Sequence, residues 1–214
     1  APGTYPVCTS DTLRFVRAGY DFNAQDVEEE IEEYPVGHSA ASLARARRTG
    51  RPYMTAALAR VNASWDALSK DARYAAAKAG LRPPEYNPFA NNIAQAVELV
   101  DVLDRCAALC RRLAADEFEG LSAPVPFEVR AGRGVGFTEA PRGALFHILD
   151  IDGDGRIERA SIMTPTAQNI ANLEADMRQL AGKMVAGGYD ADLITLEVEK
   201  LVRAYDPCLS CSVH

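Results

Sequence analysis

The last nine residues of the chain, DPCLSCSVH, bring two thiols and an imidazole close together in sequence. Cys208, Cys211 and His214 follow one another at intervals of three residues, so their side chains can converge on one metal ion. Pro207 fixes the backbone before Cys208 and leaves the following amides free to stabilise a thiolate. The tail is therefore predicted to ligate a metal.

Other interpretations of the thiol pair remain open, namely a thioredoxin-like redox pair, half of a zinc site, or a buried pair at a chain end. The first lacks its strand-then-helix context. A closed zinc site lacks ligands, because His38 and His147 lie in unrelated segments. The chain has five cysteines, namely Cys8, Cys106, Cys110, Cys208 and Cys211. An odd number favours free thiols or metal ligands over a disulfide framework, so a reducing compartment is expected.

Three further motifs have both a chemical and a purely structural interpretation. Asp150 to Ile157 imitates the start of an EF-hand calcium loop, but Ser161 stands where the loop needs glutamate, and strand-like flanks favour a hairpin turn. Arg142 lies between a proline and a glycine. It is either an arginine whose position is fixed by the backbone or an ordinary surface arginine at a turn. Residues 163–169 place hydroxyls and amides at a helix start, where they cap the helix or cradle an anion.

Charge and hydropathy exclude two classes of partner. The net charge is −7 and the basic residues are interspersed with acidic ones, so no stripe suited to a nucleic acid exists. No window approaches the roughly 20 apolar residues of a membrane span, and the first residues lack a signal-peptide pattern. The chain is expected to be cytoplasmic.

Periodicity predicts an α+β fold, mainly a helical bundle with a small β-hairpin insert. We expect four regions: an N-terminal segment at 1–25, a helical bundle region at 26–123, a β-rich insert at 124–166, and a helical C-terminal region with the metal-ligand tail at 167–214.

Within the bundle region an acidic helix is expected at 26–33, ended by Pro35-Val36-Gly37, and a polar surface or interface segment at 38–48. Two helices at 53–61 and 65–79 are separated by a turn and cap at 62–64. Asn87 should cap a long helix at 89–115. The spacing of its apolar residues is typical of a buried bundle helix, in Ile93, Ala96, Val97, Val100, Leu103 and Leu113.

Cys106 and Cys110 lie one turn apart on this helix and are predicted to be core thiols, with metal chelation as the alternative. Short strands are expected in the β-rich insert, at 127–130, 134–139, 144–150 and 156–162. Helices at 167–184 and 190–204 follow, and Asp206-Pro207 ends the second.

The closing motif Asp-Pro-Cys-x-x-Cys-x-x-His, unbroken from Asp206 to His214, resembles the signature of nickel-iron hydrogenase large subunits. The run EAPRG at 139–143, TPTxxN at 164–169 and NPFxNN at 87–92 occur in the family's order, so the likeness begins at about Asp21. Residues 20–60 resemble the soluble, multi-subunit class most. The resemblance implies part of the large-subunit fold and reversible heterolytic oxidation of H2.

The resemblance also implies a nickel-iron centre in which four cysteine thiolates hold nickel, and two of them are shared with an iron that carries CO and cyanide. Cys208 is similar to the terminal nickel thiolate and the proton acceptor, and Cys211 to a bridging thiolate. Arg142 resembles the arginine suspended over the metal pair, where a fixed cation stabilises charge separation and donates to a cyanide. Thr166 resembles the hydroxyl that bonds the other cyanide.

The same resemblance to the hydrogenase family implies further site residues. Ala140, Pro141 and Pro165 are expected to line the apolar pocket around CO. His214 and the backbone carbonyl of Ile162 resemble ligands of a magnesium (or iron) near the C-terminus.

The family's other cysteine pair, in an Arg-x-Cys-Gly-x-Cys setting, is absent, since neither Cys8 nor Cys106 has that surrounding sequence. We therefore expect a chain or segment carrying the N-terminal half of the large subunit as a partner. An iron-sulfur small subunit should take the electrons, with nicotinamide- or deazaflavin-reducing subunits beyond it. The end at His214 resembles a processed subunit. The rival hypotheses are a non-catalytic subunit of a hydrogenase-related complex and a small zinc- or calcium-binding module.

Overall fold

The computed structural model describes residues 11–115 and 126–213, and they form the expected α+β fold. A three-stranded antiparallel sheet lies at its centre, in the order β5 (Gly132–Ala140), β6 (Gly143–Ile151) and β7 (Ile157–Met163). Alternate residues of the central strand face the core, because side chains on a strand alternate between its two faces. The fully or nearly buried ones are Ala144, Phe146 and Ile148.

Three of the four strands expected in the insert are confirmed, and the predicted strand at 127–130 is wrong because those residues pair with no strand. The loop between β6 and β7 is a hairpin turn. In it, Oδ1 of Asp152 accepts hydrogen bonds from the amides of Asp154 at 2.9 Å and Arg156 at 2.8 Å. The acidic loop is thus explained by turn geometry, as the strand-like flanks predicted.

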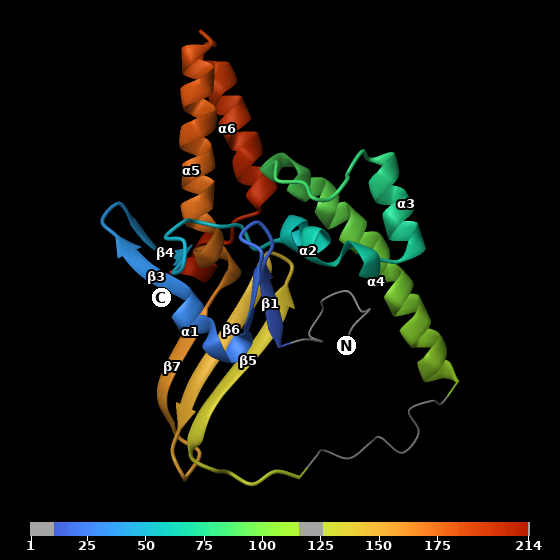
Figure 1. Ribbon diagram of the computed structural model, residues 1–214, viewed down its shortest axis with the longest axis vertical. Coiled ribbons are helices and arrows are strands. Elements are labelled where there is room, and N and C mark those ends of the chain that lie inside the picture. The colour runs from blue at the N-terminus through green and yellow to red at the C-terminus, as the bar shows by residue number, and fades with distance from the viewer. Residues whose placement is uncertain (1–10, 116–125, 214) are drawn as a thin grey trace.

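The first of two N-terminal hairpins packs against the sheet, and the second extends away from it and packs against α5 (Figure 1). The first joins β1 (Thr12–Phe15) to β2 (Tyr20–Asn23), and the second joins β3 (Ile31–Val36) to β4 (Ser39–Ala46). Between them lie the short helices η1 (Ala24–Asp26) and α1 (Val27–Glu30).

The acidic helix expected at 26–33 is therefore wrong beyond residue 30, and the surface segment expected at 38–48 is mostly a strand. The physical reason is burial of apolar side chains from both strands, which overrides the helix propensity of the glutamates. Ile31 is 3% exposed and Leu43 is 4% exposed. Gly37 and His38 form the turn, since Val36 still pairs with Ser39.

A second, helical layer contains α2 (Ala57–Ser64), η2 (Trp65–Ala67) and α3 (Lys70–Lys78), which share one apolar core with the start of α4 (Asn91–Ala114). The turn expected at 62–64 is wrong, because these residues complete α2. The cap of the next helix is Ser69 instead, whose Oγ accepts from the amide of Ala72 at 3.1 Å.

Helix α4 is preceded by η3 (Pro88–Ala90), where Asn87 accepts from the amide of Phe89 at 3.1 Å, as the cap prediction required. The helix is buried only at its start. Leu103 is 62% exposed, Leu113 is 55% exposed, and Cys106 and Cys110 are exposed free thiols. The predictions of a buried helix and of core thiols are wrong for this half, because its apolar side chains and thiols are exposed among the described residues.

Helices α5 (Pro165–Ala186) and α6 (Ala191–Tyr205) form an antiparallel hairpin that projects from the body (Figure 1). Both were predicted within a few residues. Thr164 and Asp190 are their N-caps, and each accepts a hydrogen bond from a backbone amide of the first turn. The chain leaves α6 at Asp206 and continues into the short helix η4 (Leu209–Ser212).

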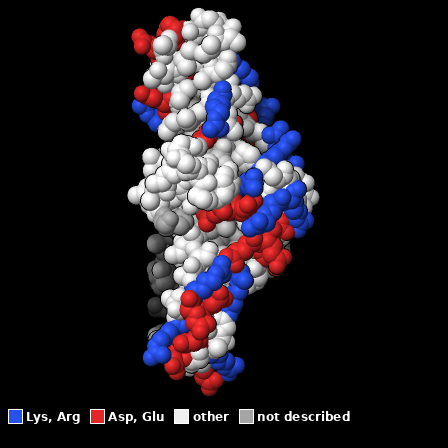
Figure 2. Space-filling model, turned by 90° about the vertical axis from the view of Figure 1, so that its left-hand side faces the viewer, with Lys and Arg blue, Asp and Glu red and all other residues white. Residues whose placement is uncertain are grey.

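On the face shown in Figure 2, charges of both signs lie side by side in the lower half, without a stripe of one sign, and much of the upper half is uncharged. Glu28 on α1 pairs with Arg133 and Arg159, each at 2.5 Å, and so ties the first hairpins to the sheet. The hydrogen bond from Arg159 is the main cause that lowers the pKa of Glu28. Among the described residues, none of the helices has the length and apolar character needed to cross a membrane.

Candidate metal centre

The turn between β5 and β6 carries Arg142. Ala140 pairs with Gly143 across the turn, and Gly143 has a φ of +131°. A Cβ at Gly143 would lie 2.2 Å from the carbonyl oxygen of Thr55, so the close approach of these two backbones requires glycine. The EAPRG run thus forms a tight turn pressed against the segment before α2.

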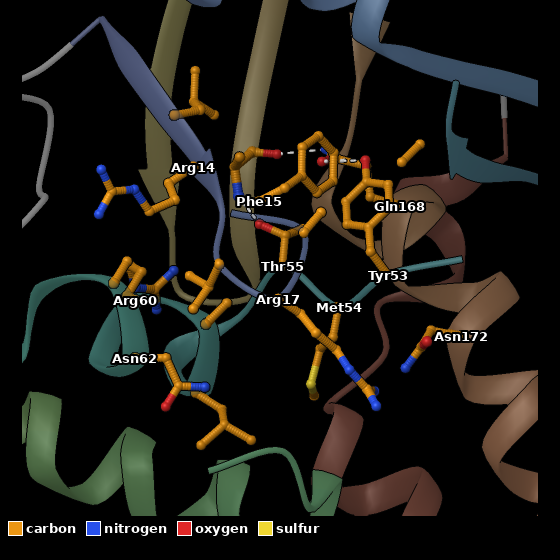
Figure 3. A pocket seen from close by; sticks show the side chains of 18 of the residues that line it. Arg14, Phe15, Arg17, Tyr53, Met54, Thr55, Arg60, Asn62, Gln168 and Asn172 are labelled. Atoms are coloured by element: carbon orange, nitrogen blue, oxygen red, sulfur yellow. Dashed lines mark hydrogen bonds between the residues drawn. The ribbon is translucent and has the colours of Figure 1, made fainter. Parts of the chain in front are cut away.

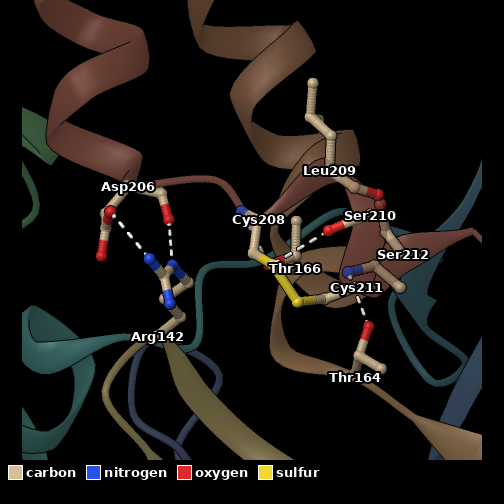
Figure 4. The surroundings of a disulfide bond; sticks show 10 residues. Arg142, Thr164, Thr166, Asp206, Cys208, Leu209, Ser210, Cys211 and Ser212 are labelled. Carbon is tan, nitrogen blue, oxygen red and sulfur yellow. Dashed lines mark hydrogen bonds and ion pairs between the residues drawn. A yellow bond between two sulfur atoms is a disulfide. The ribbon is translucent and has the colours of Figure 1, made fainter.

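The guanidinium of Arg142 points towards the end of α6 (Figure 4). Its Nε donates to the carbonyl oxygen of Asp206 at 2.5 Å, and its Nη2 donates to Oδ1 of the same residue at 3.1 Å. Asp206 has a left-handed conformation, with a φ of 48°, which ends α6 and directs the chain into the tail. Arg142 therefore lies beside the first residue of the cysteine motif, held by two charge-assisted bonds.

Cys208 and Cys211 are joined by a disulfide in the structure, with their Cα atoms 5.3 Å apart. The expectation of free thiols is thus wrong for this form of the chain. The amide of Cys211 donates to the carbonyl oxygen of Cys208 at 2.9 Å, so the backbone folds into a tight turn that brings both sulfurs to one point. Only the reduced pair could ligate a metal as thiolates.

Thr166 lies directly beside this turn. Its side chain is 2% exposed, and its Oγ1 accepts from the amide of Cys208 at 3.3 Å. Pro165 begins α5 and is buried, because proline suits the first position of a helix. The start of α5 therefore supports the cysteine turn, which agrees with a role for these residues at one site.

The other predicted site residues lie on the Arg142 turn, on β7 and at the end of the chain. Ala140 is half-buried and Pro141 is exposed, both on the Arg142 turn. Ile162 is 43% exposed on β7, opposite His147 of β6. His214 lies outside the described residues, as does Cys8, so the expected magnesium pair stays a prediction. Within the described ranges, no group of three or more His, Cys, Asp or Glu side chains could hold a metal by itself.

The donor set fits half of a nickel-iron centre. Two soft sulfur donors lie at one point. The buried Thr166 hydroxyl bonds the Cys208 amide, and the Arg142 guanidinium bonds Asp206 two residues earlier. Soft thiolates suit nickel and iron. A complete site would need further sulfurs from outside these residues. In the reduced state Cys208 and Cys211 are the residues that would hold the metals.

Side chains from three elements bond the backbone on either side of Arg142. They are Asn169, which belongs to the TPTxxN run, and Thr55 and Arg60, which the sequence analysis did not single out. They come from α5, the segment before α2, and α2 itself. Beside them lies a cavity of about 1030 Å³, lined in part by Phe15, Tyr53, Met54 and Gln168 (Figure 3). No local pattern marks Thr55 and Arg60, because their contacts form only on folding.

The fold and site have counterparts among known proteins. Residues 31–214 match the family described as nickel-dependent hydrogenase. Sulfhydrogenase 1 subunit alpha of Pyrococcus furiosus is 38% identical over 92% of this chain and 44% of its own length. The beta subunit of the NAD-reducing hydrogenase HoxS of Cupriavidus necator is 32% identical over 58% of this chain and 25% of its own length.

Solved structures share the fold. A NAD+-reducing [NiFe]-hydrogenase in the H2-reduced state superposes with a TM-score of 0.74 at 24% identity, over 90% of this chain and 43% of that one. The Ni-Fe-Se hydrogenase of D. vulgaris Hildenborough gives 0.62 at 22% identity, over 92% of this chain and 47% of that one.

The chain belongs to the nickel-dependent hydrogenase family. It spans less than half the length of the relatives given above.

Proposed function

We propose that this chain is the C-terminal part of a hydrogenase catalytic subunit, which completes a nickel-iron centre for the reversible, heterolytic oxidation of H2. The observation that carries the proposal is the cysteine turn, in which Cys208 and Cys211 present both sulfurs at one point beside Arg142 and Thr166. The metals, with their CO and cyanide ligands, would supply the soft, electron-accepting site at which H2 is polarised.

The roles of the protein groups follow from their chemistry. The Cys208 thiolate would accept the proton when H2 splits, because a thiolate close to the reacting atoms is a basic and polarisable acceptor. Cys211 would be the thiolate shared between nickel and iron. Arg142 would stabilise developing negative charge as a cation whose position is fixed, and would donate to a cyanide.

Thr166 would donate a hydrogen bond from its hydroxyl to the second cyanide while its oxygen accepts from the Cys208 amide, since a hydroxyl can do both. Pro165, Pro141 and Ala140 would form the apolar surround. His214 and the carbonyl of Ile162 would hold a magnesium ion near the C-terminus.

The chain needs partners for this reaction. A polypeptide or segment with the missing thiolates would complete the centre, and an iron-sulfur small subunit would take the electrons. Nicotinamide- or deazaflavin-reducing subunits would complete the complex. A cytoplasmic location suits it, since a reducing compartment keeps Cys208 and Cys211 as thiolates.

The test is Cys208→Ser in the assembled complex, with Cys106→Ser on exposed α4 as the matched control. We expect the first variant to lose nickel or H2 uptake and the control to keep both, as measured by elemental analysis and a hydrogen-uptake assay. Infrared bands of CO and cyanide should be present in the wild type. Unchanged nickel and activity in Cys208→Ser would refute the assignment, and zinc or calcium alone would identify a metal-binding module instead.

A further inference from the structure

Arg60, on α2, is nearly enclosed, with a side chain that is 8% exposed. Its Nη1 donates to the carbonyl oxygen of Ala140 at 2.9 Å, and its Nη2 donates to that of Pro141 at 2.9 Å. These are the two carbonyls immediately before Arg142. One guanidinium therefore fixes two consecutive peptide planes of the turn.

The rest of the Arg60 guanidinium is held by two carboxylates. Nε and Nη2 bind Glu98 of α4 at 2.6 and 2.7 Å, and Nη1 binds Glu139 of β5 at 2.8 Å. A guanidinium has five N–H groups in a rigid plane. Every one of them is used by these five hydrogen bonds, so the orientation of the group is fully determined.

The pKa shifts of Arg60 and Glu139 agree with a tightly held ion pair. Burial by itself would lower the pKa of Arg60, but the hydrogen bond to Glu98 and the charges of both glutamates raise the pKa above its usual value. Burial raises the pKa of Glu139, against the opposing charge and hydrogen bond of Arg60. A buried arginine with two carboxylates is a costly arrangement that a simple apolar contact could replace if packing were its only purpose.

The opposite side of the turn is held as well, since Asn169 donates to the carbonyl oxygen of Arg142 at 3.0 Å. Three consecutive carbonyls, from Ala140 to Arg142, are thus each bound by a side chain of a helix. The direction in which Arg142 leaves the turn depends on these backbone planes. The guanidinium of Arg142 then reaches Asp206, two residues before Cys208.

We infer that Arg60 is a positioning residue for the proposed hydrogen-oxidation site, which acts through the Ala140-Pro141 backbone to aim Arg142 at the cysteine turn. The inference rests on the proposed function. It requires the planar fork of arginine, because the single ammonium of lysine cannot bond two carbonyls and two carboxylates together.

The test compares Arg60→Lys with Arg105→Lys in the assembled complex. Arg105 is a matched control because it also bonds a carboxylate, Asp101 at 2.5 Å, and a backbone carbonyl, Ala67 at 3.0 Å, away from the turn. We expect Arg60→Lys to keep its nickel while kcat for H2 falls about 10- to 100-fold and KM changes little, the scale for a misplaced catalytic group. Its cyanide infrared bands should shift, and the control should match the wild type in all respects.

Wild-type kcat and band positions in nickel-loaded Arg60→Lys would overturn the inference alone. A wild-type complex without nickel would overturn both the inference and the proposed function. If Arg60→Lys does not assemble, Glu98→Gln replaces it, because this variant keeps Arg60 and weakens the two-point anchor of its guanidinium. Shifted cyanide bands in Glu98→Gln would then support the inference, and unshifted bands would refute it.

Discussion

Asn169 and Arg142 are joined by a hydrogen bond from the carboxamide Nδ2 to the backbone carbonyl oxygen, at 3.0 Å. The same Nδ2 donates to the carbonyl oxygen of Thr55 at 2.9 Å, and Oδ1 accepts from the amide of Thr55 at 2.7 Å. One buried side chain thus links α5, the β5–β6 turn and the segment before α2. The position of Arg142 depends on three elements that are far apart in sequence.

Asn169→Asp removes the donor to two partly buried carbonyls and leaves the shape of the side chain almost unchanged. We expect the free energy of unfolding to fall by about 2 to 3 kcal/mol, the scale for leaving buried polar groups unsatisfied. Denaturant unfolding measures this change. The exposed Asn92→Asp is the control, and an equal loss in both variants would contradict the assigned role.

Gly143→Ala should be among the most damaging small substitutions in the chain. The added Cβ would meet backbone atoms of Thr55 at a φ of +131°, so strain and steric overlap act together. We expect a loss of about 3 kcal/mol or more, together with loss of activity. Gly153→Ala is the control, because its added Cβ meets nothing within 4 Å. Its melting temperature should stay close to that of the wild type.

Thiol reactivity should divide the four cysteines that the structure describes into two classes. The exposed thiols of Cys106 and Cys110 should react with an alkylating reagent at once. Cys208 and Cys211 should react only after reduction of metal-free protein, because they are bonded to each other. Peptide mass spectrometry identifies the labelled sites. Labelling of Cys208 without reductant would show that the metal-free tail is not a disulfide.

Glu33 gives the protein a pH-dependent stability. Burial raises the pKa of its carboxyl to about 7, and its Oε1 is buried without a hydrogen-bond partner among the described residues. The folded state therefore holds a proton that the unfolded state has released, so stability falls as pH rises from about 4.5 to 7. The group is partly accessible, and screening by solvent limits the effect to about 1 to 2 kcal/mol.

The matched variant is Glu33→Gln, which mimics the neutral carboxyl at every pH. Melting temperatures of wild type and variant should agree near pH 4.5 and separate towards pH 8, with the wild type lower. Parallel curves over this range would contradict the raised pKa.

The sequence alone determined the elements whose cause is local. Neighbouring residues determine helix capping, as at Asn87 and Thr164, as well as apolar periodicity and the breaks at proline and glycine. For this reason α4, α5, α6 and the β5–β7 sheet were predicted nearly as they occur. The cysteine motif and the EAPRG run were also recognisable, because their chemistry lies in a few adjacent residues.

Tertiary structure alone decided the rest. The β3 strand replaces half of an expected acidic helix, since Ile31 gains more from burial than the glutamates lose in helix propensity. The far half of α4 is exposed although its apolar spacing is regular, because spacing specifies a face and not what covers it. The anchoring of Arg142 by Arg60 and Asn169 joins residues separated by 82 and 27 positions. Such contacts leave no local signal, since they exist only once the chain has folded.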